Sequence, residues 1–242
     1  MQEENLEQQT KNQLRRFEQA VELPFFNEET GEKMQFVSDG IVEIPEYQKA
    51  PIKILWILKE ANSSEDNSLA DMRPCLKELY DDGNNIDVDW GHTWRPIAYA
   101  TYGIFEGVNF LDIPEMNGNA REVLKYMPSI AHINVKKYAG GSRENQKEVQ
   151  KFYNKYKNLL HEQIEVINPD ILIFGSTFGY FEEYFEGKEK IQERLFPIYQ
   201  WGNKLLIDAC HPNGLRGARI KQDEYCNEII NAVKKWKQKM QK

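Results

Sequence analysis

Cysteine is scarce in this sequence, and its few positions exclude the common cysteine-based sites. Only Cys75, Cys210 and Cys226 occur in 242 residues, and no two of them are spaced as a Cys-x-x-Cys pair. An odd number of cysteines without that spacing argues against a disulfide framework, a structural zinc site and a four-cysteine cluster. We therefore expect reduced thiols, no bound metal and a cytoplasmic protein.

Long apolar runs and a surplus of positive charge are also missing. No apolar run reaches about eighteen residues, and the first residues, MQEENLEQQTKNQ, are polar, so neither a membrane span nor a secretion signal is expected. The net charge of −7 counts against a broad basic face for duplex DNA, but leaves a local basic groove open. The phosphate-binding pattern Gly-x-x-x-x-Gly-Lys-Ser/Thr is absent as well.

Apolar runs alternate with helical patterns along most of the chain. Hydrophobic residues make up 40% of the sequence and charged residues 29%, which is enough for a packed core. Four runs are typical of buried strands: Ile52–Leu58, Ser129–Val135, ILIF at 171–174 and NKLLIDA at 203–209. Residues 144–167 and 221–240 have helical spacing. This alternation indicates an α/β protein whose parallel sheet is covered on both faces.

The length of the chain favours one domain over two. A single α/β domain commonly reaches the 242 residues found here, so residues 1–242 are expected to form one unit. Residues 4–21 show a polar helical pattern with a thin apolar stripe. Residues 1–50 could therefore form an N-terminal helical extension of the domain.

Polar residues stand where three of the expected strands end. Glu60 follows the first strand, Asn134 lies at the end of the second, and His211 follows the last. A glutamate can orient or deprotonate water, an asparagine can bind a two-sided polar edge, and a histidine can stabilise an oxygen that gains negative charge. Because ligands of parallel sheets bind beyond the carboxyl ends of the strands, we expect these side chains to meet at one edge.

Four segments, in chain order, resemble motifs of the uracil-DNA glycosylase superfamily. LKEANSSED is similar to its first motif, a strand followed by a Gly-Glu-Ala-Pro-Gly-like loop. AHINVKKYAGGSRENQKEVQ resembles the stretch in which Asn-Val-Val-Lys precedes a loop and a long helix. INPDILIFGS is similar to a Pro-Lys-Val-Ile-Val-Ala-Leu-Gly strand, and ACHPNGLRG resembles the closing His-Pro-Ser-Pro-Leu motif. The order and spacing agree over residues 52–235.

The resemblance implies a three-layer α/β/α sandwich around a mainly parallel, four-stranded sheet. It also implies hydrolysis of the N-glycosidic bond of a deaminated or damaged DNA base, flipped out of its stack, without metal or cofactor. By position, Glu60 would place or activate water, Asn134 would bind the base, and His211 would support the departing base anion. Trp94 would supply the ring that stacks on the base.

DNA, single-stranded or with a flipped-out base, is the partner that the resemblance implies. Neither a membrane nor a protein partner is expected. The expected nucleic-acid contacts lie after the second strand or in the closing loop: Lys136, Lys137, Arg143, Pro212, Asn213 and Gly214.

The sequence departs from the family pattern in both outer motifs. Lys59 stands where the family has glycine before the acid, and could crowd the pocket or pair with Glu60. Asn213 and Gly214 replace the second Ser-Pro of the closing motif, and three cysteines cannot supply the four of the iron–sulfur branch. These changes keep two other functions open: a binding module of the same fold without catalysis, and a hydrolase of a free nucleoside or nucleotide.

Each candidate residue also has an ordinary structural explanation. His211 could be a turn residue, Glu60 could cap a helix near Ser63, and Asn134 could only satisfy neighbouring backbone groups. The lysines after Asn134 could be a solvated loop. A Cys210–His211 nucleophile pair is disfavoured, since neighbours on an extended segment point to opposite sides. No role is assigned to the isolated histidines His92, His132 and His161. Strand alternation is taken to place His132 off the face of Asn134.

Overall fold

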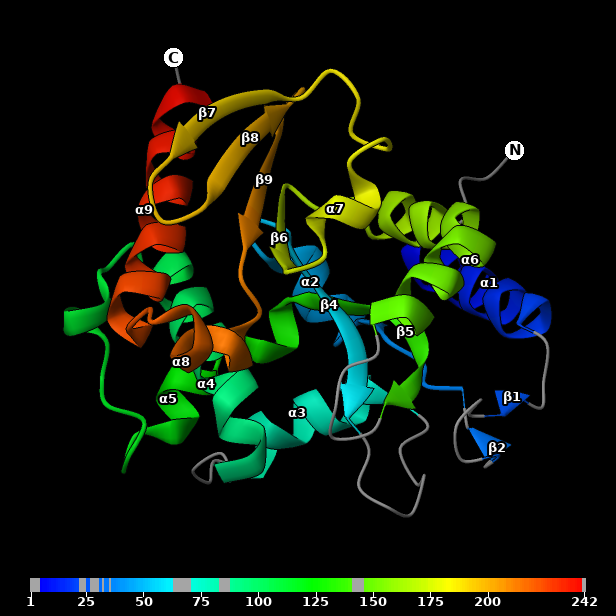
Figure 1. Cartoon of the computed structure of the whole chain (residues 1–242). Helices are drawn as coiled ribbons and strands as arrows, with labels where there is room; N and C mark the ends of the chain where they lie inside the picture. The colour runs from blue at the N-terminus through cyan, green and yellow to red at the C-terminus, as the bar shows by residue number, and fades with distance from the viewer. Residues whose placement is uncertain are drawn as a thin grey trace.

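The computed structural model describes residues 5–21, 25–26, 31, 33–34, 36–62, 71–82, 88–140 and 146–240. Its centre is a mixed sheet of seven strands between two layers of helices (Figure 1). The α/β class expected from the sequence is confirmed. A separate hairpin pairs β1 (Phe25–Phe26) with β2 (Lys33–Met34). In the part of the chain that the structure describes, no helix is long and apolar enough to cross a membrane.

Four parallel strands form the middle of the sheet. Their order is β5 (Ala131–Gly140), β4 (Ile54–Asn62), β6 (Ile171–Gly175) and β9 (Lys204–Ala209). The apolar runs expected to be strands supply all four. The second strand continues through Lys136 and Lys137 to Gly140, so the loop expected after Val135 is part of the strand.

Three antiparallel strands flank this parallel centre, so the expectation of a four-stranded sheet was wrong. β3 (Gly40–Ile41) pairs with β5 at one edge, and β8 (Pro197–Trp201) and β7 (Glu189–Glu193) follow β9 at the other. Two of these strands lack the apolar run by which a buried strand is predicted from sequence. β3 has only two residues, and the side chains of β7 are mostly exposed.

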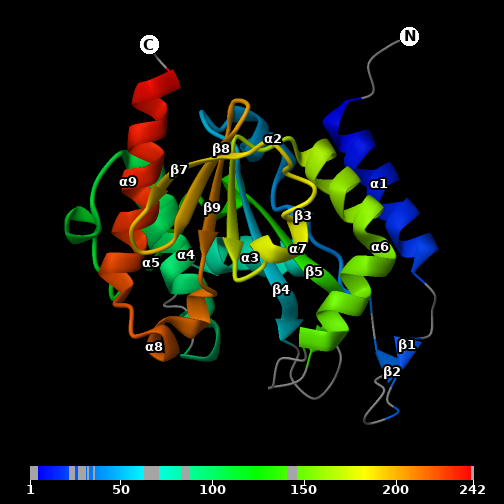
Figure 2. The same ribbon diagram turned by 45° about the horizontal axis from the view of Figure 1, so that its top comes forward.

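The sheet face that carries Trp56 and Leu58 packs against four helices. These are α3 (Met72–Asp82), α4 (Val88–Glu106), α5 (Ala120–Leu124) and α9 (Gln222–Met240). Gly103 in α4 gives α9 close access, since a Cβ there would lie 2.3 Å from Ile230 Cδ1. The helices α4, α5 and α9 of this layer stand on the left in Figure 2.

The opposite sheet face, with Leu55 and Ile57, is covered by four helices of the described chain. These are α1 (Leu6–Ala20), α2 (Ile44–Lys49), α6 (Gln146–Ile167) and the short α7 (Phe178–Phe181). The α6 stripe from Val149 to Ile167 is core, as its spacing predicts. α7 has only four residues, and its Phe178 and Phe181 are both buried. Because Phe17 of α1 belongs to this core, the N-terminal helix is part of the domain.

Candidate functional site

The carboxyl ends of β5, β4, β6 and β9 point to one edge of the sheet (Figure 2). Glu60 pairs in register with Lys136, and Leu58 pairs with Asn134. Glu60 and Asn134 therefore lie on neighbouring strands, but Glu60 lies within β4 and Asn134 in the first half of β5, so the expectation that Glu60 follows its strand and that Asn134 ends its strand was wrong. His211 follows β9, two strands away from β4 in the sheet order.

Glu60 is held in a buried group of charges rather than in a solvated loop. Lys136 Nζ lies 2.5 Å from Glu60 Oε2 and 3.0 Å from Glu148 Oε2, a carboxylate in the first turn of α6. The side chains of Lys136, Glu60 and Glu148 are 3%, 10% and 14% exposed. One ammonium thus faces two carboxylates, which fixes the position of Glu60.

Asn134 is fixed through its backbone, while its side chain has no protein partner in the described residues. Its N–H donates to Asp39 Oδ2 at 2.8 Å. Its side-chain Oδ1 and Nδ2 are both buried without a hydrogen bond. The alternative that this amide serves neighbouring backbone groups is therefore wrong. Buried polar atoms normally find partners, so this amide is an exception to the usual rule.

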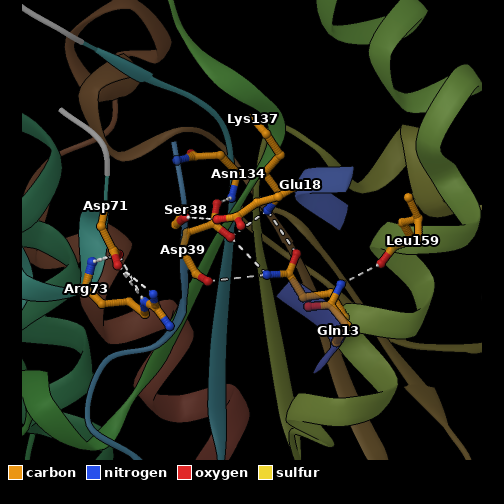
Figure 3. A network of polar contacts seen from close by, with 10 residues as sticks. Gln13, Glu18, Ser38, Asp39, Asp71, Arg73, Asn134, Lys137 and Leu159 are labelled. Carbon is orange, nitrogen blue, oxygen red and sulfur yellow. Dashed lines mark hydrogen bonds and ion pairs between the residues drawn. The ribbon is translucent and has the colours of Figure 1, made fainter. Parts of the chain in front are cut away.

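Asp39 connects Asn134 to the opposite face of the sheet (Figure 3). Its Oδ1 lies 2.5 Å from Lys137 Nζ and accepts a hydrogen bond of 3.0 Å from Gln163 Nε2 of α6. Asp39 and Lys137 have side chains that are each 1% exposed. Burial lowers the pKa of Lys137, and the neighbouring Asp39 opposes that shift. The Asp39 carboxylate thus accepts the hydrogen bond from the Asn134 N–H, which in a sheet usually goes to a carbonyl of the neighbouring strand. The same carboxylate neutralises the buried ammonium of Lys137.

Two hydrogen bonds donated by backbone N–H groups hold His211 just after the end of β9. Its N–H donates to Ser176 Oγ at 2.8 Å, and its ring Nδ1 accepts a hydrogen bond of 3.2 Å from the Asn213 N–H. Because Nδ1 is an acceptor, the neutral ring carries its proton on Nε2. Ser176 has φ 59°, a left-handed conformation that costs a non-glycine residue energy and recurs near functional sites.

Gly175 lets this loop come close to the neighbouring strands. A Cβ at this position would lie 2.5 Å from Leu58 Cδ2 and 3.6 Å from His211 Cα. The backbone at the end of β6 therefore lies between the loop that carries His211 and the side chain of Leu58, and it leaves no room for a side chain at position 175. Leu58 is the register partner of Asn134. Thr177 Oγ1 donates to the carbonyl of Ile57 at 2.8 Å and ties the same turn to β4.

Trp94 lies inside the core, against His132, to which no role was assigned from the sequence. Trp94 is 5% exposed, and its ring contacts His132 edge-on with centroids 5.0 Å apart. His132 is two residues before Asn134 on β5, so both project from the same face; the expectation that it lies off that face was wrong. Burial lowers the pKa of His132 to about 3, with smaller effects of Lys137 and His211.

Burial excludes two of the residues that were expected to contact nucleic acid, Lys136 and Lys137. Lys136 is enclosed by carboxylates, and Lys137 points to the α6 side and pairs with Asp39; neither presents its ammonium to solvent. The view of these lysines as a solvated loop is wrong for the same reason. Arg143 lies outside the described residues. In the closing loop, Pro212 is buried, whereas Asn213 and Gly214 are exposed.

No metal centre or paired nucleophile is formed by the described side chains. Among residues 5–21, 25–26, 31, 33–34, 36–62, 71–82, 88–140 and 146–240, no three His, Cys, Asp or Glu side chains are grouped to hold a metal ion. Burial raises the pKa of the half-buried Cys210 thiol, which disfavours the thiolate.

Comparison with known proteins gives no family. No protein-family model matches the chain, and no curated protein matches it.

Proposed function

We propose that the chain is a uracil-DNA-glycosylase-like hydrolase that cleaves the N-glycosidic bond of a deaminated or damaged base in DNA. The observation that supports the proposal is the buried, unpartnered amide of Asn134 on β5, next to the strand β4 that carries Glu60, in the parallel sheet whose strand β9 is followed by His211. Such an amide has a donor and an acceptor, which suits the keto and imino groups of a base edge. The ordered resemblance over residues 52–235 supports the same reaction.

In the proposed reaction, water adds to the sugar carbon while the bond from that carbon to the base nitrogen breaks. The electron pair leaves with the base, so the departing ring gains negative charge. His211 donates a hydrogen bond to an oxygen of that ring through Nε2–H, and Glu60 accepts a proton from the water. Asn134 orients the base.

A polymeric partner is supported by the surface next to the closing loop. Helix α8 (Leu215–Ala218) begins after Gly214, and the exposed cations Arg216, Arg219 and Lys221 lie on it or just after it. They make this short segment locally basic, directly before Asp223 and Glu224 of α9, in a chain of net charge −7. Backbone phosphates of a nucleic acid would bind such a segment, whereas a free nucleoside would not need it.

The test is base release from single-stranded oligonucleotides that carry uracil, hypoxanthine or xanthine, followed by cleavage at abasic sites. His211→Ala should lower the single-turnover rate by about ten- to a thousandfold, the usual loss for one donor to a developing anion. His92→Ala is the matched control, since His92 is an exposed histidine of α4. An unchanged rate in His211→Ala would remove this histidine from the mechanism.

A second candidate, a base-binding module without catalysis, is favoured by one observation. Lys136 holds Glu60 at 2.5 Å and covers it to 10% exposure, which restricts the carboxylate as a partner for water. The same oligonucleotides distinguish the two. Retained binding without strand breaks for every lesion would favour the module, and release of any base would favour the hydrolase.

A further inference from the structure

An open groove runs between α1 and α6, two helices that lie side by side on the right in Figure 2. Its volume is about 440 Å³, inside the range of about 300–1,000 Å³ that ligand sites usually occupy. Gln9 and Gln19 of α1 both line the groove, and ten residues of an α-helix span about 15 Å. The groove is therefore long enough for an elongated ligand, and none of the described residues that line it belongs to the site proposed above.

Amide and guanidinium groups dominate the lining of this α1–α6 groove. Arg16 Nη1 lies 2.5 Å from Glu162 Oε1 of α6, so this arginine is already paired. Arg15 is exposed and forms no ion pair with the described residues. The groove thus offers one guanidinium that can bind an anion. The side-chain amides that line it all come from α1: Gln9, Asn12, Gln13 and Gln19.

Gln13 combines deep burial with an unused hydrogen-bond acceptor. It is 3% exposed, and its Nε2 donates a hydrogen bond of 3.2 Å to the carbonyl of Leu159 on α6 (Figure 3). Its Oε1 accepts no hydrogen bond from the part of the chain that the structure describes. Because a buried amide oxygen normally has a partner, a ligand of this groove should supply a donor to Gln13 and an anionic group to Arg15.

These two requirements fit a peptide better than DNA. An extended peptide has a backbone N–H for Gln13 Oε1, further N–H and C=O groups for the other amides, and a carboxylate on each acidic side chain. A DNA backbone has no donor for Gln13, and the Glu162 carboxylate would repel its phosphates. We propose that the α1–α6 groove docks an extended, acidic segment of a partner protein, whose carboxylate binds Arg15 and whose backbone N–H donates to Gln13 Oε1. This inference does not depend on the proposed function.

The experiment is a titration of the full chain with the capped peptide Ala-Glu-Ala-Glu-Ala, observed through the side-chain ¹⁵N–¹H signals of arginine and glutamine. Five extended residues span about 16 Å, which matches the groove. The signals of Arg15 Nε and Gln13 Nε2 should shift. Arg15→Gln should weaken binding by about two- to fivefold, the usual effect of one exposed charge pair. Lys157→Gln is the matched control, since it removes the same charge from an exposed lysine of α6 outside the lining, and it should leave affinity unchanged.

Unshifted Arg15 and Gln13 signals would overturn the docking site. Equal weakening by Arg15→Gln and Lys157→Gln would show an unspecific attraction between charges, and equal binding of Ala-Gln-Ala-Gln-Ala would show that no carboxylate is recognised; either result refutes the inference. Displacement of the peptide by oligothymidylate would assign the groove to nucleic acid and overturn it as well. Shifted signals, with weakening confined to Arg15→Gln and to the glutamine peptide, would uphold it, whether or not the chain releases any base.

Discussion

Replacing Asp39 with asparagine tests the buried network behind Asn134. Asparagine has nearly the same shape and still offers an oxygen to the Asn134 N–H, but it removes the negative charge beside Lys137. Breaking a buried ion pair by changing one partner typically costs about 3–5 kcal/mol, because the other charge stays buried without compensation. Both side chains here are 1% exposed, so solvent screening is small.

The size of this effect has an upper limit that can be calculated. Lys137 can lose its proton instead of remaining charged, and neutralising a lysine of pKa about 10.4 at pH 7 costs about 5 kcal/mol. In the variant, folded Lys137 would be neutral while the unfolded lysine still binds a proton. Stability of Asp39→Asn should therefore rise relative to wild type as pH increases, by up to about 1.4 kcal/mol per pH unit between pH 7 and 9.

Urea unfolding at pH 7 and pH 9 measures both quantities. Adding Lys137→Met to Asp39→Asn should restore much of the loss, because no unpaired charge then remains. Glu46→Gln is the control, since its pair with Lys49 is exposed and should contribute less than about 1 kcal/mol. A loss below about 1 kcal/mol for Asp39→Asn, or no recovery at pH 9, would refute the reasoning.

Three further predictions concern the strand ends. Gly175→Ala should destabilise by about 1–3 kcal/mol in urea, because its Cβ would meet Leu58 Cδ2 at 2.5 Å; wild-type stability would contradict that close approach. Between pH 7 and 5, wild type should lose about 2 kcal/mol more stability than His132→Phe, because the unfolded histidine binds a proton near pH 6.5 and the folded one only at about 3; parallel curves would contradict this. Burial, with Glu182 nearby, raises the pKa of Asp208 to about 6, so Asp208→Asn should gain about 1 kcal/mol at pH 7 after allowance for solvent screening, and this gain should vanish near pH 3, where the carboxyl is mostly protonated in both states; an equal gain at both pH values would contradict it.

The parallel centre of the sheet could be predicted because its signal is local. The run Ile54–Leu58 is buried on both faces, and the same holds for Ile171–Phe174, so continuous apolar runs mark these strands. The stripe of α6 is equally local, with Val149, Phe152 and Tyr156 at helical spacing. The same signal placed Glu60 and Asn134 on two strands of one parallel sheet, but the strand of Asn134 continues six residues further, to Gly140, through polar residues that carry no apolar signal.

The surroundings of the site could not be predicted, because they depend on partners far away in the chain. Lys137 is buried only because Asp39 lies 98 residues earlier and meets it across β3 and β5. Lys136 is buried because Glu60 and Glu148 come from two other elements. A pair of adjacent lysines looks like a solvated loop unless those partners are known. His132 is different, since its two-residue spacing from Asn134 was visible in the sequence.

Strand β5 breaks the usual preference for apolar side chains in a buried parallel strand. Within six residues it carries His132, Asn134, Lys136 and Lys137, all at most 3% exposed. Apolar residues of similar volume in place of buried ion pairs are often neutral or stabilising, so stability alone does not account for this choice. The two lysines are neutralised by carboxylates, whereas the histidine and the amide have no protein partners in the described residues. A dry site for an uncharged polar ligand requires that charged groups are paired and that polar, uncharged groups are left without protein partners. Polar residues in a buried strand are a local departure from the usual pattern, and such departures are expected where a fold serves function.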